Sequence, residues 1–449
     1  MKARVSQPGA AERQLIVRCA RLDLDEAEAI EVEALLARPL TWHELILFAE
    51  AHSVAPLLHH HLKRCEASEL VPHLFRQRLL KLSHRAGYRN RAFRRAFQEL
   101  ADAFGAVGVT VIVPKGLSLL ESIYGNLSLR PLIDLVLLVR TEEWDRAARA
   151  ASDLGYLDIA PPPLRNFNRW YSSQVHLVKR GSFDIHLLLQ WDLSSRPTSH
   201  ALDIRQVWAE ARPTVLSERA ALVPSPVHLV LYLCLQAAKH GYLNVAAADV
   251  EDPAAMVFAE WTNNRLIRFT DIFEAIRHHR DALDWTLLAD RARAAGMAHV
   301  AYASLRWVTR LFGPVTDAAI LAGLGSPEPR RVRRWLFEAL TLGPGGPGTV
   351  TVMTGVATLT LRDRTFPRRR LLQMLDLVEF VFPRREEFRR RHEQLSRGGL
   401  LLAYTTHVGR ALGRCAGGIV GRAHWATVRW ARAVSGRVAG HHHLQPRSK

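Results

Sequence analysis

Apolar residues recur at helical spacing along the N-terminal part of the chain. From Asp23 to Phe104, leucine, phenylalanine and alanine return every three or four positions, which is typical of helices with one buried face. Thr41 followed by Glu44 has the spacing of a capping box and predicts that a helix begins there. Residues 85–104 contain many basic and no β-branched side chains, so they predict one long amphipathic helix.

Short β-branched and apolar runs replace the helical pattern beyond Val107. Two of these runs predict buried strands, and a hairpin is predicted to turn at residues 179–181. Helical patterns separate the strands. The predicted elements are, in order, residues 109–113, 117–124, 134–139, 141–154, 174–178 and 182–189. Their order predicts a compact sheet unit of about 90 residues with helices packed against it.

Helical periodicity returns at Ser225. Pro226 suits the first position of a helix, and residues 227–240 are apolar enough for that helix to be buried. The further predicted helices are residues 268–279, 285–296 and 299–312. The glycines and prolines of residues 343–348 predict a break, which Arg-rich helices follow.

These patterns predict an α+β fold in four parts. The predicted parts are a helical segment at residues 1–105, an α/β core at 106–200, a helical domain at 201–340, and a linker with basic C-terminal helices at 341–449.

The composition is that of a globular protein. Of the 449 residues, 48% are hydrophobic and 23% are charged, which excludes a mainly disordered or collagen-like chain. The four cysteines lie far apart without a CxxC pair, which argues against a disulfide framework and a structural zinc site. The uncharged residues 339–361 include many glycines and prolines, so we expect no transmembrane helix. Because the polar N-terminus also lacks the apolar core of a signal peptide, we expect a soluble cytoplasmic protein.

The charge is concentrated at the C-terminal end of the chain. The formal net charge is +18, and residues 364–449 supply +13 of it, with 18 basic and 5 acidic residues. Arginines interleave there with Trp425 and Trp430, which suits contact with RNA or with an anionic surface. The alternative is a solvated face, because the whole chain has 54 arginines and only 7 lysines.

Lys115 and Gly116 follow a predicted strand and precede a predicted helix. A glycine at such a turn lets a ligand approach the backbone, and the lysine adds positive charge, so the pair is a candidate phosphate site. An ordinary surface turn has the same sequence pattern.

Three further residues are candidates for metal chemistry. Asp134 opens an apolar strand, although aspartate is disfavoured in strands. Asp184 and His186 lie two residues apart on a later strand and therefore share a face. Two carboxylates opposite a lysine-bearing turn suit Mg²⁺ and a polyphosphate. The alternative is that both aspartates bond to nearby loops and that His186 is a half-buried histidine.

The order of these motifs resembles the uncharacterised nucleotidyltransferase family of the polymerase-β-like superfamily. That family has a Lys-Gly turn, then Arg-Pro-x-x-Asp-x-Asp-Leu-Leu-Val, Leu-Gly-Tyr and a later Asp-x-His strand. The similar segments are residues 111–116, Tyr124, residues 129–139, 154–156, 184–186, 228–241 and 265–271. The resemblance extends over roughly residues 35–395.

The resemblance implies a polymerase-β-like core with a small mixed sheet. It implies an enzyme that transfers a nucleoside monophosphate from a nucleoside triphosphate to an acceptor and releases pyrophosphate. The acceptor expected for such proteins is a peptide, a sugar or a small metabolite. The roles that it implies are Mg²⁺ held by Asp134 and Asp184, nucleotide contacts from Lys115, Gly116 and Arg130, and assistance from His186.

Two positions depart from the family's pattern. Val136 stands where the family has its second aspartate, and Pro114 stands where it usually has leucine. Residues 134 and 136 of a strand share one face, so the valine removes an oxygen ligand from the expected metal site. The sequence therefore leaves a second hypothesis open, a catalytically degenerate relative that binds a nucleotide or serves as a scaffold.

Overall fold

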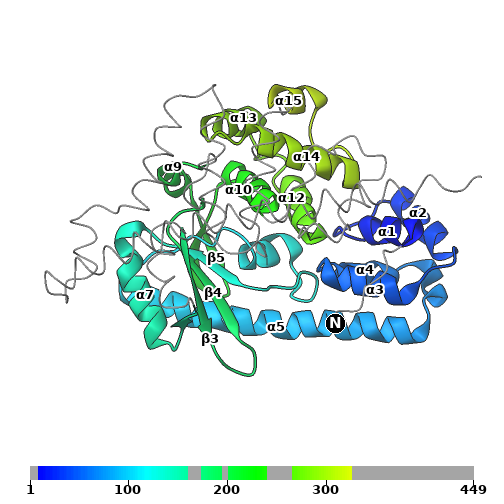
Figure 1. The fold of residues 1–449 in the computed structure, drawn as a ribbon, viewed down its shortest axis with the longest axis horizontal. Coiled ribbons are helices and arrows are strands. Elements are labelled where there is room, and N and C mark those ends of the chain that lie inside the picture. Colours follow the sequence, from blue (N-terminus) through cyan, green and yellow to red (C-terminus); the bar gives the residue numbers. More distant parts are fainter. Residues whose placement is uncertain (1–8, 160–172, 195–200, 240–264, 326–449) are drawn as a thin grey trace, which may run out of the picture. The chain divides into compact units, whose positions relative to one another are not determined.

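The computed structural model describes residues 9–159, 173–194, 201–239 and 265–325 (Figure 1). The chain divides into two units, Met1–Ala339 and Leu340–Lys449, and every described residue belongs to the first. The predicted linker and basic C-terminal helices lie outside the described residues. The described helices and a small mixed sheet bury one continuous hydrophobic cluster, which confirms the predicted α+β class. No helix of the described ranges combines the length and apolarity needed to cross a membrane.

The N-terminal part is helical, as predicted. Its elements are α1 (Ala10–Arg18), α2 (Glu26–Leu36), α3 (Trp42–Ala51), α4 (Ala55–Leu62), a short 3₁₀ helix (Glu66–Leu70) and α5 (His73–Ala106). The predicted capping box at Thr41 is wrong, although Thr41 is the N-cap of α3. The Thr41 N–H donates to Glu12 Oε1 at 2.7 Å, so Glu12 takes the place that Glu44 has in the predicted box.

Helix α5 is longer than the predicted residues 85–104 and begins directly after Pro72. Figure 1 shows its first half beside α3 and α4, while its second half reaches β4 and α7. One face of α5 is buried along its length. That face includes Leu79, Phe93, Phe97, Leu100 and Phe104. The helix therefore connects the N-terminal helices with the sheet.

The main sheet has four strands in the order β1-β4-β3-β2, with β1 parallel to β4 and the other pairs antiparallel. Its strands are β1 (Leu135–Leu138), β2 (Leu157–Asp158), β3 (Gln174–Lys179) and β4 (Ile185–Gln190). Helix α6 (Leu117–Leu119) and a π-helical turn (Leu120–Tyr124) precede β1, and a 3₁₀ turn (Thr141–Glu143) and α7 (Trp144–Asp153) connect β1 to β2. The predicted second strand and the predicted hairpin are confirmed.

The predicted strand at residues 109–113 is reduced to a bridge. Ile112 exchanges hydrogen bonds with Leu138 on one side and forms a parallel bridge to Leu222 on the other. Pro114 has no N–H to extend this ladder, which explains why no regular strand forms. Through Ile112, the sheet adjoins a hairpin that the sequence did not predict, β5 (Arg212–Leu216) and β6 (Arg219–Val223).

The first four helices described after residue 225 agree with the prediction, whereas the fifth, at residues 318–323, was not predicted. They are preceded by a short helix, α9 (Ile204–Ala209). They are α10 (Pro226–Lys239), α12 (Leu266–His278), α13 (Trp285–Ala294), α14 (Ala298–Phe312) and α15 (Ala318–Gly323). Pro226 is the first residue of α10, and the described side chains of α10 are almost all buried.

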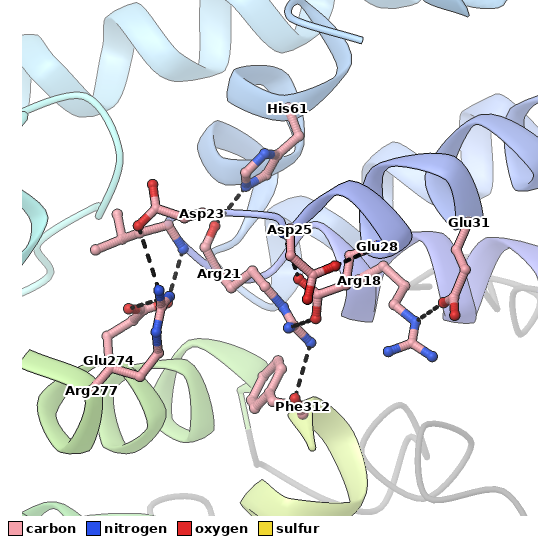
Figure 2. Close-up of polar contacts among 11 residues, drawn as sticks. Arg18, Arg21, Asp23, Asp25, Glu28, Glu31, His61, Glu274, Arg277 and Phe312 are labelled. Carbon is pink, nitrogen blue, oxygen red and sulfur yellow. Dashed lines mark hydrogen bonds and ion pairs between the residues drawn. The ribbon is translucent and has the colours of Figure 1, made fainter. Parts of the chain in front are cut away.

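A polar network fastens the N-terminal helices to α12 and α14 (Figure 2). The Arg21 side chain is buried, pairs with Glu28 and donates from Nη2 to the Phe312 carbonyl oxygen at 3.3 Å. The Leu22 N–H donates to Glu274 Oε1 at 2.9 Å. Helix α12 is therefore hydrogen-bonded to the N-terminal helical segment, which comes before the predicted α/β core in the sequence.

Candidate functional site

The loop that leads into β1 is held in place by one buried side chain of α5. Asn90 Nδ2 donates to the carbonyl oxygens of Leu127 and Arg130, at 2.6 and 2.8 Å. Its Oδ1 accepts from the Leu132 N–H at 2.9 Å. Asn90 is fully buried, so these three bonds have no competition from solvent. They position the backbone two residues before Asp134.

Arg130 holds the same loop to α12. Its Nε and Nη2 donate to the two carboxylate oxygens of Asp271, at 2.7 and 2.6 Å, and Tyr124 donates to the same carboxylate at 2.9 Å. Burial alone would lower the pKa of Arg130, but attraction by Asp271 outweighs it, so the pKa is raised and the guanidinium stays charged. The predicted nucleotide contact Arg130 is thus engaged with a buried carboxylate.

Lys115 and Asp134 are brought together at the start of β1. Lys115 Nζ lies 3.6 Å from Asp134 Oδ1, and both side chains are partly exposed. Gly116 has φ of +72°, which favours glycine. A Cβ atom on Gly116 would lie 3.7 Å from Leu132 Cδ2, so the turn rests directly on the segment before Asp134. The predicted lysine-bearing turn therefore faces the predicted carboxylate.

Asp134 is surrounded by positive charge. In addition to Lys115, the side chains of Arg89, Arg130 and Arg268 are electrostatically attracted to Asp134, although burial and Arg85 outweigh this attraction at Arg89 and lower its pKa. For Arg268, burial and a neighbouring arginine outweigh this attraction and lower the pKa to about 10. Four cations from four different segments thus converge on one carboxylate, and this concentration of charge favours an anionic ligand.

Val136 forms an apolar floor beside Asp134. The two residues point to the same side of β1, and Val136 is 1% exposed. Next to them, the Tyr232 hydroxyl donates to Gln190 Oε1 at 3.3 Å, and burial raises the pKa of Tyr232. Position 136 therefore has neither an oxygen ligand nor contact with bulk solvent.

His186 is level with Asp134 in the sheet. Leu135 pairs with Leu187 in parallel register, so the preceding residues of the two strands lie side by side. His186 Nδ1 lies 2.9 Å from Nε2 of His176 on β3. His176 was not predicted from the sequence. Its signal was the alternation of polar residues along β3, which places it on the same sheet face.

Asp184 lies two residues before His186, just outside β4 and toward the hairpin turn. Its carboxylate pairs with the guanidinium of Arg180 across that turn. The described residues contain no group of three or more histidine, cysteine, aspartate or glutamate side chains arranged to hold a metal ion. Lys115, Gly116, Asp134 and His186 thus lie at one end of the sheet, where β1 begins, while Asp184 is engaged with the turn.

This site belongs to an α+β protein whose Lys115-Gly116 turn faces a carboxylate at the start of a strand. A sequence model of the uncharacterised nucleotidyltransferase family matches residues 38–313, and the chain belongs to that family. The match includes the α5 asparagine, the Lys-Gly turn, the β1 loop and α12. Nucleotidyl transfer is the general activity that membership indicates. Searches of curated proteins and of solved structures found no match.

Proposed function

We propose that this protein transfers a nucleoside monophosphate from a nucleoside triphosphate to an acceptor with the help of Mg²⁺. The observation that supports the proposal most is the pairing of Lys115 with Asp134, 3.6 Å apart, with Arg89 and Arg268 also attracted to Asp134. Phosphoryl chemistry depends on positioning and on neutralising the phosphate charge, and such a group of residues is suited to both.

The donor set suits a metal that arrives with the nucleotide. Mg²⁺ is commonly bound by one or two carboxylates together with substrate phosphate oxygens and water, so Asp134 alone is a sufficient protein anchor. When bound, Mg²⁺ supplies charge stabilisation at the transferring phosphate. The proposed second ligand, Asp184, contributes only if its carboxylate exchanges Arg180 for the metal.

The other residues have distinct proposed roles. Lys115 neutralises the phosphates, and Gly116 lets them approach the backbone of the turn. Arg130 acts as a positioning residue, because its guanidinium holds the loop that presents Asp134. His186, level with Asp134, is placed to orient the acceptor.

Val136 favours a second candidate function, that of a degenerate relative which binds a nucleotide or serves as a scaffold. A buried valine supplies no oxygen where the family has its second aspartate. The variant Val136→Asp separates the two. If a ligand has been lost in this chain, the variant binds nucleotide with stronger dependence on Mg²⁺ than the wild type does.

The acceptor remains a peptide, a sugar or a small metabolite by family resemblance. Contact with RNA or an anionic surface through the C-terminal arginines also remains a prediction, since those arginines lie outside the described residues.

The activity is tested with nucleoside triphosphates labelled at either the α- or the γ-phosphate. The protein is incubated with each labelled nucleotide, Mg²⁺ and a metabolite and peptide extract. The proposal predicts that α-label appears on an acceptor and γ-label in pyrophosphate, and that both products vanish in Asp134→Ala. Transfer of the γ-label to an acceptor would instead indicate a kinase. Absence of any transfer, with nucleotide binding intact, would support the degenerate relative.

A further inference from the structure

Arg89 reaches from α5 to the backbone beside Asp134. Its guanidinium lies over the Phe93 ring, 5.6 Å from the centroid, and Nη2 is 3.4 Å from the Ile133 carbonyl oxygen. That distance makes a weak hydrogen bond. The Nε atom is buried and has no hydrogen-bond partner among the described residues. A buried guanidinium N–H without an acceptor is costly, and such groups often mark a site for an anion.

The cations around Asp134 outnumber the carboxylates that attract them. Arg89 and Lys115 are both drawn to Asp134, while Arg268 is drawn to Asp134 and Asp271. Asp271 is already bonded through both oxygens to Arg130. One carboxylate thus attracts several cations, and this accumulation of positive charge favours a polyanion.

The apolar side chain at position 136 suggests what the positive charge around Asp134 is for. In a site with two strand aspartates, bound metal supplies much of the charge that neutralises a triphosphate. Here buried Val136 stands where the family resemblance implies the second of those aspartates, whereas guanidinium groups approach from α5 and α12. Arginine N–H groups bind phosphate oxygens with strong, charge-assisted hydrogen bonds and need no metal.

We propose that Arg89 of α5, with Lys115 and Arg268, binds the terminal phosphates of the nucleotide and lets this site hold a polyphosphate without a divalent metal. The inference rests on the proposed function, since it assigns the triphosphate to the same site. It adds a phosphate-binding residue that lies upstream of the Lys-Gly turn and assigns part of the metal's neutralising charge to side chains.

Calorimetric titration of inorganic tripolyphosphate and of ATP, each in EDTA and in Mg²⁺, tests this proposal. The variant is Arg89→Gln, which keeps most of the side-chain length. Arg89→Lys is added to retain the charge, and thermal melting verifies that each variant folds. Arg91→Gln is the matched control, because Arg91 is an exposed arginine of the same helix.

The proposal predicts tripolyphosphate binding in EDTA that weakens about tenfold or more in Arg89→Gln and is largely retained in Arg89→Lys and Arg91→Gln. Removing the repelling carboxylate in Asp134→Ala should leave this metal-free binding intact or strengthen it. Two results would overturn the inference: binding only when Mg²⁺ is present, or equal affinity in Arg89→Gln and wild type. Either result leaves the proposed function standing, whereas failure of wild type to bind ATP in both buffers contradicts the proposed function itself.

Discussion

Arg130 and Asp271, 141 residues apart in the sequence, form a bidentate buried ion pair with N–O distances of 2.7 and 2.6 Å. The pair joins the loop before β1 to α12. Asp134 lies at the end of that loop, and Arg268 lies on that helix one turn before Asp271. The ion pair therefore sets the relative positions of the carboxylate and one of the cations of the candidate site.

Breaking this pair from one side should be strongly destabilising. Asp271→Ala leaves the Arg130 guanidinium buried without its carboxylate, and we expect a loss of about 3–5 kcal/mol in the free energy of unfolding. Urea denaturation measures it. The double variant Arg130→Met, Asp271→Leu should recover much of that loss. As a matched control, Glu31→Ala removes an exposed partner of Arg18 and should change stability by less than about 1 kcal/mol. Equal effects of Asp271→Ala and Glu31→Ala would refute the role of the pair.

Asn90 should be equally sensitive to its chemistry. In Asn90→Asp, a carboxylate would face the carbonyl oxygens of Leu127 and Arg130, which now accept from the amide. We expect a loss of about 3 kcal/mol or more, because two donors become an unpaired buried charge. Asn126→Ala, an exposed residue of the same loop, should cost about 1 kcal/mol or less. If Asn90→Asp unfolds at the same urea concentration as wild type, Asn90 does not hold the loop.

The protein should become less stable as the pH falls, because His52 is buried in its neutral form. Burial, together with nearby arginines, lowers its pKa from 6.5 to about 3, and its Nδ1 accepts the Leu266 N–H, which requires the neutral ring. The unfolded chain therefore binds a proton between pH 6.5 and 3 that the folded chain does not. The free energy of unfolding should decrease by as much as about 1.4 kcal/mol for each unit by which the pH falls within that range.

The His52→Asn variant isolates this contribution from that of other histidines. It should be less stable than wild type at pH 7, but its stability should depend less steeply on pH between 6.5 and 4. Urea denaturation at several pH values compares the two slopes. Identical slopes would show that His52 does not contribute to the acid sensitivity.

The turn of the β5–β6 hairpin should be improved by glycine. Ser217 and Glu218 have φ values of +47° and +64°, a conformation that favours glycine or asparagine over other residues. Glu218 is exposed, so Glu218→Gly should stabilise the protein by about 0.5–1 kcal/mol. Ser217→Gly is the contrasting variant, because it also removes the hydroxyl that donates to Glu121 at 2.6 Å. A lower melting temperature for Glu218→Gly would contradict this explanation.

Periodicity was sufficient to predict most of the helices and three of the strands. It did not predict β5 and β6, because their turn is Ser-Glu and lacks the Asn-Gly or Asp-Gly signal of a tight hairpin. It predicted a strand at residues 109–113 on β-branched content alone. Both bridges of that segment are centred on Ile112, and Pro114 has no N–H to extend them, a restriction that β-branched content does not reveal.

The residues of the candidate site also divide into those that the sequence identified and those that it did not. Lys115, Gly116 and Asp134 lie within twenty residues of one another in a motif, so the sequence identified them. Asn90 and Arg89 donate hydrogen bonds to backbone carbonyls about forty residues further along the chain. In the sequence, Asn90 was only a polar residue on the buried face of a helix, and Arg89 was one of many arginines. The role of Arg130 depended on its partner in α12, which no local pattern indicates.

Calorimetric titration of ATP, CTP, GTP and UTP, with and without Mg²⁺, shows whether Asp134 anchors a nucleotide together with its metal. Wild type is compared with Asp134→Ala and with Asp153→Ala, an exposed aspartate of α7. We expect Mg²⁺ to tighten the binding of at least one nucleotide to wild type and to Asp153→Ala, and this gain to disappear in Asp134→Ala. If no nucleotide binds wild type, or if Mg²⁺ tightens binding to Asp134→Ala equally, the nucleotide site does not lie at Asp134.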